Sequence, residues 1–307
     1  MFEYAVLKVI WWLLVGVLLI GFAIMDGHDM GVGTLLPFVG KTDEERRVVI
    51  NTVGPHWDGN QVWFITGGGA IFAAWPLVYA TAFSGFYWAM LAVLWALFFR
   101  PVGFDYRSKI DNPTWRKTWD WGLFVGGSVP PLIFGVAFGN LLQGVPFYFD
   151  NNLMSYYTGS FWALLNPFAL LCGVVSTAMI TFHGAIYLSL RTEGSIAGRA
   201  RKAGYIFGSL LLLTFTLAGI WLWQAIPGYV IESAIQPNAL PNPLGKSVIR
   251  EAGAWLANYQ RYPLTTALPL IVYTMVPIAM WLMSKSKNLA GFAASSLVII
   301  GVISTAG

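Results

Sequence analysis

Seven uncharged, hydrophobic stretches cover about two thirds of the 307-residue chain, and the charged residues gather between them. A membrane-spanning helix needs about 20 apolar residues, because each residue rises about 1.5 Å and the hydrocarbon core is about 30 Å thick. One stretch is long enough for two crossings, so the pattern predicts eight. The stretches are 9–25, 59–99, 121–149, 151–190, 203–231, 262–284 and 288–307.

This pattern predicts an all-α fold, a polytopic bundle of about eight transmembrane helices that forms a single transmembrane domain over residues 1–307. The composition agrees, because 57% of the residues are hydrophobic and only 10% are charged. The spacing of Gly135 and Gly139 allows close helix contact. The predicted helices are 6–25, 58–79, 83–99, 121–142, 162–189, 204–226, 264–283 and 289–307.

The positive charges divide unequally between the two sides of this predicted bundle. If every helix crosses once, 14 of the 18 lysines and arginines lie in the loops 26–60, 100–120, 190–203 and 284–288. Positively charged loops are retained in the cytoplasm, so we expect this face inside and the N-terminus outside. The scattered basic residues do not form the continuous patch that nucleic-acid binding requires.

Three polar clusters interrupt the hydrophobic pattern, all on the predicted cytoplasmic side. The first is DGHDMG, where Asp26 and Asp29 are three residues apart and share a helix face at the expected end of the first helix. Carboxylates inside a membrane often mark proton pathways. A solvated helix end is the simpler interpretation of this pair.

The second cluster, PHWDGNQVW, opens the second predicted helix. His56 and Asn60 are four residues apart and Asp58 and Gln61 three apart, so two polar stripes enter the membrane. Asp58 also complements the helix dipole, and helix capping alone could explain the cluster.

The third cluster, FFRPVGFDYRSK, follows the next helix and contains Arg100 and Asp105. Arg100 can pair with any of the aspartates at positions 26, 29 and 58. Titratable groups gathered at the mouth of a helix bundle are what a proton entry route needs, because each step requires a group that gains and loses a proton.

The sequence offers no recognisable metal or haem site. His28, His56 and His183 show no paired ligand spacing, so an axial pair could form only between helices, and His183 is best explained as a hydrogen-bonded structural residue. The single cysteine, Cys172, lies within an apolar stretch. We therefore expect no metal, no haem and no catalytic residue in this chain.

Over nearly its whole length the chain resembles subunit II of the bacterial cytochrome bd-type ubiquinol oxidases. The matching strings include WWLLVGVLLIGFAIMDGHDMGVG, ERRVVINTVGPHWDGNQVW, FAAWPLVYATAFSGFYWAM, FFRPVGFDYRSK and GVAFGNLLQGVPF. The similarity is weaker over residues 190–307, where NPL and REAGAW match best.

The resemblance implies a multi-pass protein of the bacterial inner membrane, without independent activity. Its partner would be subunit I, which carries two haems b and one haem d, oxidises ubiquinol and reduces dioxygen to water. Small accessory subunits and membrane lipid are further partners, and a structural ubiquinone is known in some members. The motifs place His56, Trp57 and Asp58 on a proton route and Trp63 near an oxygen tunnel.

Two features depart from the family. His28 stands where phenylalanine is usual, and the family normally has a ninth helix in addition to the eight predicted here. Two other functions also fit parts of the sequence. A secondary transporter or proton channel would explain the intramembrane carboxylates, although it should show inverted halves with helices broken at the midplane. A passive scaffold for a redox partner would need no proton role.

Overall fold

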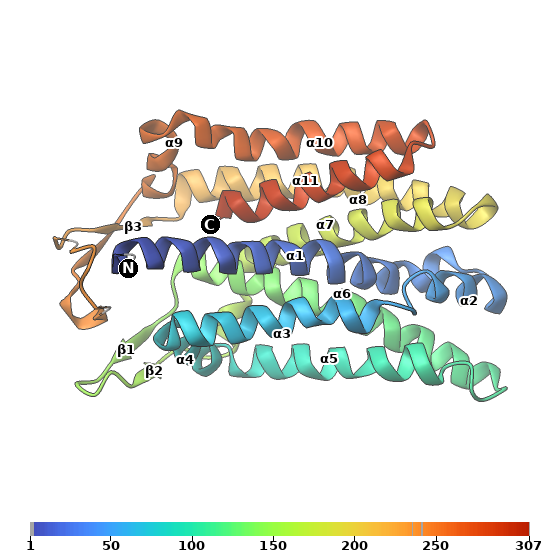
Figure 1. The fold of residues 1–307 in the computed structure, drawn as a ribbon, viewed down its shortest axis with the longest axis horizontal. Coiled ribbons are helices and arrows are strands. Elements are labelled where there is room, and N and C mark those ends of the chain that lie inside the picture. The colour runs from blue at the N-terminus through green and yellow to red at the C-terminus, as the bar shows by residue number, and fades with distance from the viewer. Residues whose placement is uncertain (1–2, 235, 241, 307) are drawn as a thin grey trace.

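The chain folds into a bundle of long helices that run side by side (Figure 1). The computed structural model describes residues 3–234, 236–240 and 242–306. The helices are α1 (Tyr4–Val39), α2 (Asp43–Asn51), α3 (Trp57–Ala74), α4 (Pro76–Gly85), α5 (Tyr87–Tyr106), α6 (Pro113–Gln143), α7 (Pro167–Arg191), α8 (Gly194–Ala225), α9 (Ala257–Arg261), α10 (Ala267–Ser284) and α11 (Asn288–Ala306).

Short elements fill the connections between these helices. Two antiparallel pairs of strands form, β1 (Phe147–Phe149) with β2 (Ser155–Tyr157), and β3 (Gly228–Ile231) with β4 (Val248–Glu251). The 3₁₀ turns are Trp162–Leu165, Pro243–Gly245, Ala254–Leu256 and Pro263–Thr266.

The predicted all-α membrane bundle is confirmed. Within the described residues, seven helices are long and apolar enough to cross a membrane, and α3 with α4 could provide an eighth crossing. The second predicted helix, 58–79, is wrong as a straight span, because α3 and α4 meet at 119° around Trp75. Pro76 explains the break: a proline has no amide hydrogen and forces the residue before it out of helical geometry.

The observed helix ends differ most from the predicted ones where the prediction took a charged residue as the limit of a membrane span. The first predicted helix, 6–25, continues through Asp26 and Asp29 to Val39. Likewise, α6 begins at Pro113 instead of residue 121, and α8 begins at Gly194 instead of residue 204. The charged residues within these helices pair with other side chains of the protein or lie beyond the apolar part of the bundle. The helices therefore continue past the charged positions.

The remaining predicted helices agree more closely. The helix predicted at 83–99 corresponds to α5, the one at 162–189 to α7 and the one at 264–283 to α10. α7 starts late because Asn166 caps it, accepting a hydrogen bond from the backbone amide of Ala169. The last predicted helix corresponds to α11, and Gly307 lies outside the described residues.

Helices α1 and α7 form the centre of the bundle. α7 packs against α1, α6, α8 and α11, and α1 also packs against α3 and α6. A side chain on Gly31 of α1 would collide with the backbone of α7 at Ile180 and Gly184. The Gly135 and Gly139 pair of α6 lies equally close to α7, which confirms the predicted helix contact.

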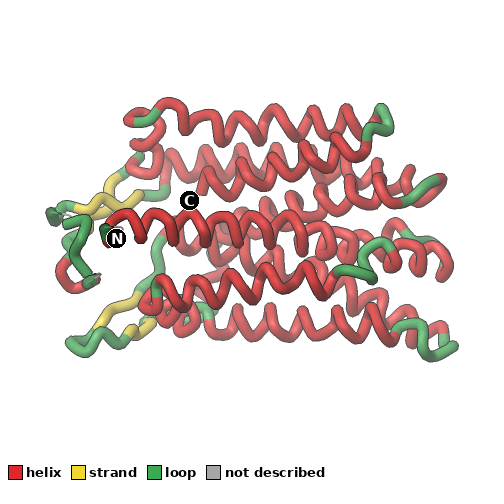
Figure 2. The backbone as a smooth tube through the Cα atoms, in the orientation of Figure 1, coloured by secondary structure: helices red, strands yellow, loops and turns green. Residues whose placement is uncertain are grey.

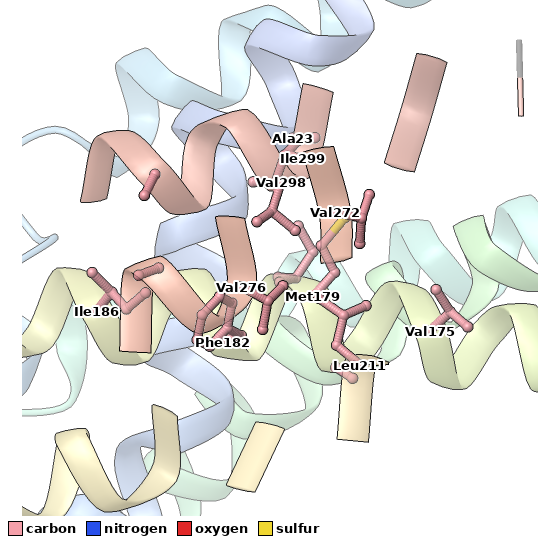
Figure 3. Packing of buried hydrophobic residues seen from close by; sticks show 14 of the residues in the cluster. Ala23, Val175, Met179, Phe182, Ile186, Leu211, Val272, Val276, Val298 and Ile299 are labelled. Atoms are coloured by element: carbon pink, nitrogen blue, oxygen red, sulfur yellow. The ribbon is translucent and has the colours of Figure 1, made fainter. Parts of the chain in front are cut away.

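The largest apolar core joins α7 to the C-terminal helices (Figure 3). Met179 and Phe182 of α7 lie among Val272 and Val276 of α10 and Val298 of α11. In a lipid environment such contacts stabilise mainly through close packing, because lipid tails are as apolar as the core. The same core includes Ala23 and Met30 of α1, so it holds α7 against α1 as well as against the C-terminal helices.

The connections gather at two opposite ends of the bundle (Figure 2). Helix α2 and the turns after α5, α7 and α10 lie at one end, on the right of Figure 1. The strands and α9 lie at the other end, with the N-terminus. The four loops that carry most of the positive charges therefore share one end, which we call the α2 end.

Candidate functional site

Helix α1 carries the first polar cluster deep inside the protein. Every residue from Asp26 to Leu36 is buried. Asp26 and Asp29 are each 1% exposed, so they are not at a solvated helix end as the simpler interpretation had it. Small residues at Gly27 and Gly31 allow neighbouring helices to approach this segment closely. Buried carboxylates need partners, because an unpaired charge in an apolar interior is very unfavourable.

Arg100 of α5 is the partner of Asp26. Its guanidinium donates to both carboxylate oxygens of Asp26, one of them from Nη1 at 2.9 Å. Arg100 is 2% exposed, and its Cζ also lies 5.6 Å from the centre of the Trp57 ring. Of the three aspartates that the sequence offered to Arg100, the structure selects Asp26.

Asp29 connects α1 to the start of α3. Its Oδ2 accepts a hydrogen bond of 2.8 Å from the side-chain amide of Asn60. The same amide lies 3.0 Å from Nδ1 of His56, and that nitrogen lies 3.7 Å from Oδ1 of Asp29. The predicted His56 and Asn60 stripe therefore faces the interior and contacts the first cluster.

His56 links this buried group to the α2 end of the bundle. Its Nε2 lies 2.9 Å from the Tyr187 hydroxyl and 3.1 Å from the carbonyl oxygen of Thr52. The side chain of His56 is 36% exposed, whereas that of Asp29 is 0% exposed. Burial lowers the pKa of His56, against the opposing effect of the bond with Thr52, so the ring is neutral near pH 7.

The second predicted stripe points the other way. Asp58 is exposed and Gln61 only partly buried, and the Asp58 carboxylate makes no ion pair in the described part of the chain. Arg100 does not pair with Asp58, because the Arg100 side chain turns into the bundle toward Asp26. Helices place residues two positions apart on opposite sides, which separates Asp58 from Asn60.

The other predicted residues lie outside this buried group. Asp105 is exposed and lines a pocket of about 200 Å³ with Arg47, Arg107 and Lys109. Trp63 is partly buried, and its ring lies directly against Gly21 of α1. Trp57 is buried and stacks on Phe104, in addition to its contact with Arg100.

His183 is hydrogen-bonded, as predicted, but it is not isolated. Its Nδ1 lies 2.7 Å from the Ser295 hydroxyl, and its Nε2 lies 3.1 Å from the Ile24 carbonyl oxygen. The His28 ring lies 6.1 Å from the His183 ring and 5.6 Å from the His56 ring, centre to centre. All three histidines therefore converge, which no spacing along the sequence indicates.

An ionic network at the α2 end was also missed from the sequence. Asp120 accepts hydrogen bonds from Arg107 at 2.5 Å and from Arg46 at 2.8 Å, and Arg107 also reaches Asp43 at 2.7 Å. Burial acts to raise the pKa of Asp43, but Arg107 and Arg116 outweigh it and lower that pKa. The many charged residues in these loops indicate that ion pairs form there, although the sequence does not specify which residues pair.

A second ion pair fastens α2 to α8. Glu45 lies 2.6 Å from a guanidinium nitrogen of Arg199 and accepts a hydrogen bond from Ser195. Glu45 also completes a capping box with Thr42 at the start of α2. The hydrogen bond from Arg199, followed by that from the backbone of Lys41, lowers the pKa of Glu45 to about 2.

The buried cluster has atoms of the types that bind metals. His28, Asp29 and His56 place ligand atoms within 4.8 Å of one another. However, His28 Nδ1 contacts the Ile24 carbonyl, and His56 Nδ1 contacts the Asn60 amide. Among the described residues, this leaves only His28 Nε2 and Asp29 Oδ1 for a metal, two of the four ligands of a typical closed site. We assign no metal ligand here.

The fold and the site define a class of protein: a multi-pass membrane helix bundle with a buried, paired cluster of ionisable side chains. The sequence profile described as cytochrome bd terminal oxidase subunit II matches residues 7–307. The chain belongs to this family.

Individual relatives agree with the family profile. The chain is 56% identical to cytochrome bd-I ubiquinol oxidase subunit 2 of Escherichia coli (strain K12) over 307 residues, covering 100% of this chain and 81% of that one. It is 55% identical to a probable cytochrome oxidase subunit 2 of Haemophilus influenzae, with the same coverage. It is 42% identical to cytochrome bd ubiquinol oxidase subunit 2 of Bacillus subtilis, covering 70% of this chain and 63% of that one.

A solved structure supports the fold. A chain in the structure of bd oxidase from Geobacillus thermodenitrificans superposes with a TM-score of 0.69, covering 98% of this chain and 83% of that chain. The two sequences are 13% identical, so this likeness concerns the arrangement of helices alone.

Proposed function

We propose that this chain is the haem-free subunit of a quinol-oxidising, dioxygen-reducing complex in the bacterial inner membrane. Its relatives are named as subunits of ubiquinol oxidases, and the chain matches them over its full length. In this proposal it forms one transmembrane unit and pairs with a subunit I that holds two haems b and one haem d. By resemblance to the family, accessory subunits, lipid and a structural ubiquinone are further components of the proposed complex.

The chain's own contribution is to proton uptake. The observation that carries this proposal is the polar chain from the partly exposed His56, through Asn60, to the fully buried Asp29. It opens toward the α2 end, which in our topology is cytoplasmic. Protons consumed in dioxygen reduction must be delivered through groups of this kind, because each transfer needs a donor and an acceptor in contact.

Asp58 is the relay toward the partner subunit in this proposal. It is exposed at the first turn of α3 and faces away from the buried cluster, so a subunit packed on α3 would cover it. In the same proposal, Trp63 lies along an apolar path for dioxygen. A transporter is less well supported, because the break between α3 and α4 lies at the end of the bundle opposite α2 (Figure 1).

Replacing Asp58 tests the relay. Asp58→Asn keeps the shape and removes the titratable proton, so haem content should stay normal while quinol-driven oxygen uptake falls by about 10²-fold or more. Glu44→Gln is the matched control, because Glu44 is an exposed acid at the same end of the bundle. Unchanged oxygen uptake in Asp58→Asn would show that Asp58 only complements the dipole of α3, and a loss of haem would show that its role is structural.

The absorbance spectrum of the purified native complex tests the broader proposal. A quinol oxidase should show haem b and haem d bands in its reduced-minus-oxidised spectrum, whereas a transporter would copurify without haem. This chain expressed alone should show no Soret band of stoichiometric intensity.

A further inference from the structure

Two buried polar atoms face each other in the cluster without hydrogen-bond partners among the described residues. They are Nε2 of His28 and Oδ1 of Asp29, separated by 3.2 Å. His28 is 3% exposed and Asp29 is 1% exposed, so bulk water does not satisfy either atom. Their contact is at ion-pair distance but is not a well-directed hydrogen bond. A buried polar group left unsatisfied destabilises a protein by about 1–3 kcal/mol, so this contact needs an explanation.

The other ring nitrogen of His28 determines where its proton lies. Nδ1 is 2.9 Å from the carbonyl oxygen of Ile24. A carbonyl oxygen only accepts, so Nδ1 carries a hydrogen, and in a neutral ring Nε2 is then a bare acceptor. An ionised Asp29 also presents only acceptors. Without a further proton, Nε2 and Oδ1 would be two acceptors in contact.

The neighbouring groups do not supply that proton. The amide of Asn60 has two hydrogens, and its contacts are with Oδ2 of Asp29 and Nδ1 of His56. His56 then carries its hydrogen on Nε2, directed at Tyr187 and Thr52. Each of these contacts pairs a donor with an acceptor, and only Nε2 of His28 and Oδ1 of Asp29 lack a donor between them.

The charges around His28 and Asp29 also favour one proton shared between these two side chains. From α5, Arg100 faces α1 but is matched by Asp26, so that buried pair has no net charge. From α7, the His183 ring donates to the Ile24 carbonyl, and the centre of the Tyr187 ring lies 4.2 Å from that of the His28 ring. One proton shared by His28 and Asp29 makes their unit neutral as well, which burial strongly favours over a net negative charge.

We propose that His28 and Asp29 jointly hold one exchangeable proton inside the bundle, and that His56 loads it. This inference rests on the proposed proton uptake for its role in turnover, but not for the presence of the proton. When His56 takes up a second proton on Nδ1 from the α2 end, it loses the hydrogen bond from the Asn60 amide. Its Nδ1–H bond then breaks as an O–H bond forms on Oδ1 of Asp29, the His56 ring returns to neutral, and Nδ1 accepts from Asn60 again. The distance of 3.7 Å between Nδ1 of His56 and Oδ1 of Asp29 requires only a small movement.

Infrared spectroscopy of the purified complex at pH 7 tests whether the proton is present. With isotope-labelled aspartate and histidine, we expect either a protonated carboxyl band that disappears in Asp29→Asn or an imidazolium band that disappears in His28→Phe. The phenylalanine ring preserves the aromatic contact with Tyr187, so the bundle should remain folded, as normal haem content would show. If neither band is found, the pair holds no proton and the proposal is overturned.

Exchange into heavy water tests the loading step. The band assigned to the pair should shift in heavy water, and His56→Gln should slow that shift by about 10²-fold, because it removes the titratable group at the entrance. Equal exchange rates in wild type and His56→Gln would overturn the assignment of His56. A metal found in stoichiometric amount in the wild type and lost in His28→Phe would overturn the proton site itself.

Turnover measurements test the functional role. In His28→Phe with normal haem content, the pH profile of oxygen uptake should lose an inflection or move by about one pH unit, because coupled groups titrate as a pair. A profile that superimposes on the wild type would overturn the role of the pair in uptake. The infrared bands do not depend on turnover, so failure of the Asp58 relay would leave the evidence for the shared proton intact.

Discussion

The pairing of Arg100 with Asp26 is the most consequential interaction of single residues in this chain. Each ion is nearly inaccessible to solvent, and each neutralises the other. A buried ion pair adds little stability relative to well-packed apolar residues, but removal of one partner leaves a buried, uncompensated charge. Arg100 therefore connects α5 to α1. Replacing Arg100 and Asp26 together should destabilise the protein less than replacing one of them alone.

Arg100→Gln should destabilise the protein by about 3–5 kcal/mol, because Asp26 is left buried without its cation. The double variant Asp26→Asn with Arg100→Gln should recover part of that loss. Thermal unfolding in detergent, together with haem retention in the complex, measures both. Equal destabilisation of the single and double variants would contradict a specific coupling between these side chains.

At the scale of elements, the contact of α1 with α7 depends on the absence of side chains. Gly31 and Gly184 face each other across the interface, and a methyl group on either would meet the backbone of the other helix. Closely packed backbones allow dispersion contacts that larger side chains would prevent. This proximity also brings the histidines of α1 and α7 together.

Gly31→Ala should therefore destabilise the bundle by about 1–3 kcal/mol, the usual effect of forced overpacking. Gly16→Ala on the same helix is the control, because no atom lies within 4 Å of the added methyl group. That change should be neutral or stabilising by up to about 1 kcal/mol, since alanine favours helix. Unfolding midpoints of the purified variants measure the difference, and equal effects would argue against the close contact.

The folded-state pKa of Glu45 is about 2, below its usual value of 4.5, so its ion pair with Arg199 stabilises the protein fully above about pH 4.5. That contribution is lost as the pH falls from about 4.5 toward 2, because protonation removes the charge. Glu45→Gln should lower the unfolding temperature at pH 7, and the difference from wild type should shrink only below about pH 4.5.

Glu44→Gln is the control for this experiment as well. Glu44 lies on the same helix but forms no ion pair in the described part of the chain. Its replacement should leave the unfolding temperature nearly unchanged at every pH. A Glu45→Gln difference that persists unchanged at low pH would indicate loss of the cap alone and not of the ion pair.

At the scale of the whole molecule, the bundle has two chemically different ends. The α2 end contains the Arg107, Asp120 and Arg46 network and the entrance to the buried cluster. The opposite end contains the two strand pairs and the N-terminus (Figure 1). Because positively charged loops are retained in the cytoplasm, we expect the α2 end inside.

Labelling of introduced cysteines tests this orientation. A membrane-impermeant thiol reagent added outside intact cells should modify Ser155→Cys, which lies in β2, and spare Ser108→Cys, which follows α5. The native Cys172 should react slowly in either case, because it lies within the membrane-spanning helix α7 and is only partly exposed. The opposite labelling pattern would reverse the topology and the proposed direction of proton entry.

The sequence by itself determined the class of fold, the approximate positions of the spans and the gathering of most positive charges at one end. These features follow from how many apolar residues a bilayer requires and from where charges interrupt them, and both can be counted along the chain. It also indicated most of the polar residues of the cluster, because such residues are rare in membrane helices.

Only the tertiary structure decided which of those residues meet. It paired Arg100 with Asp26, turned Asp58 outward, brought three histidines together and bent the α3–α4 pair at Trp75. A hydrophobic pattern does not specify how far each helix rotates about its axis or at what depth it packs against its neighbours. Those quantities depend on close contacts between helices, such as that of Gly31 with Gly184, which form only when the bundle assembles.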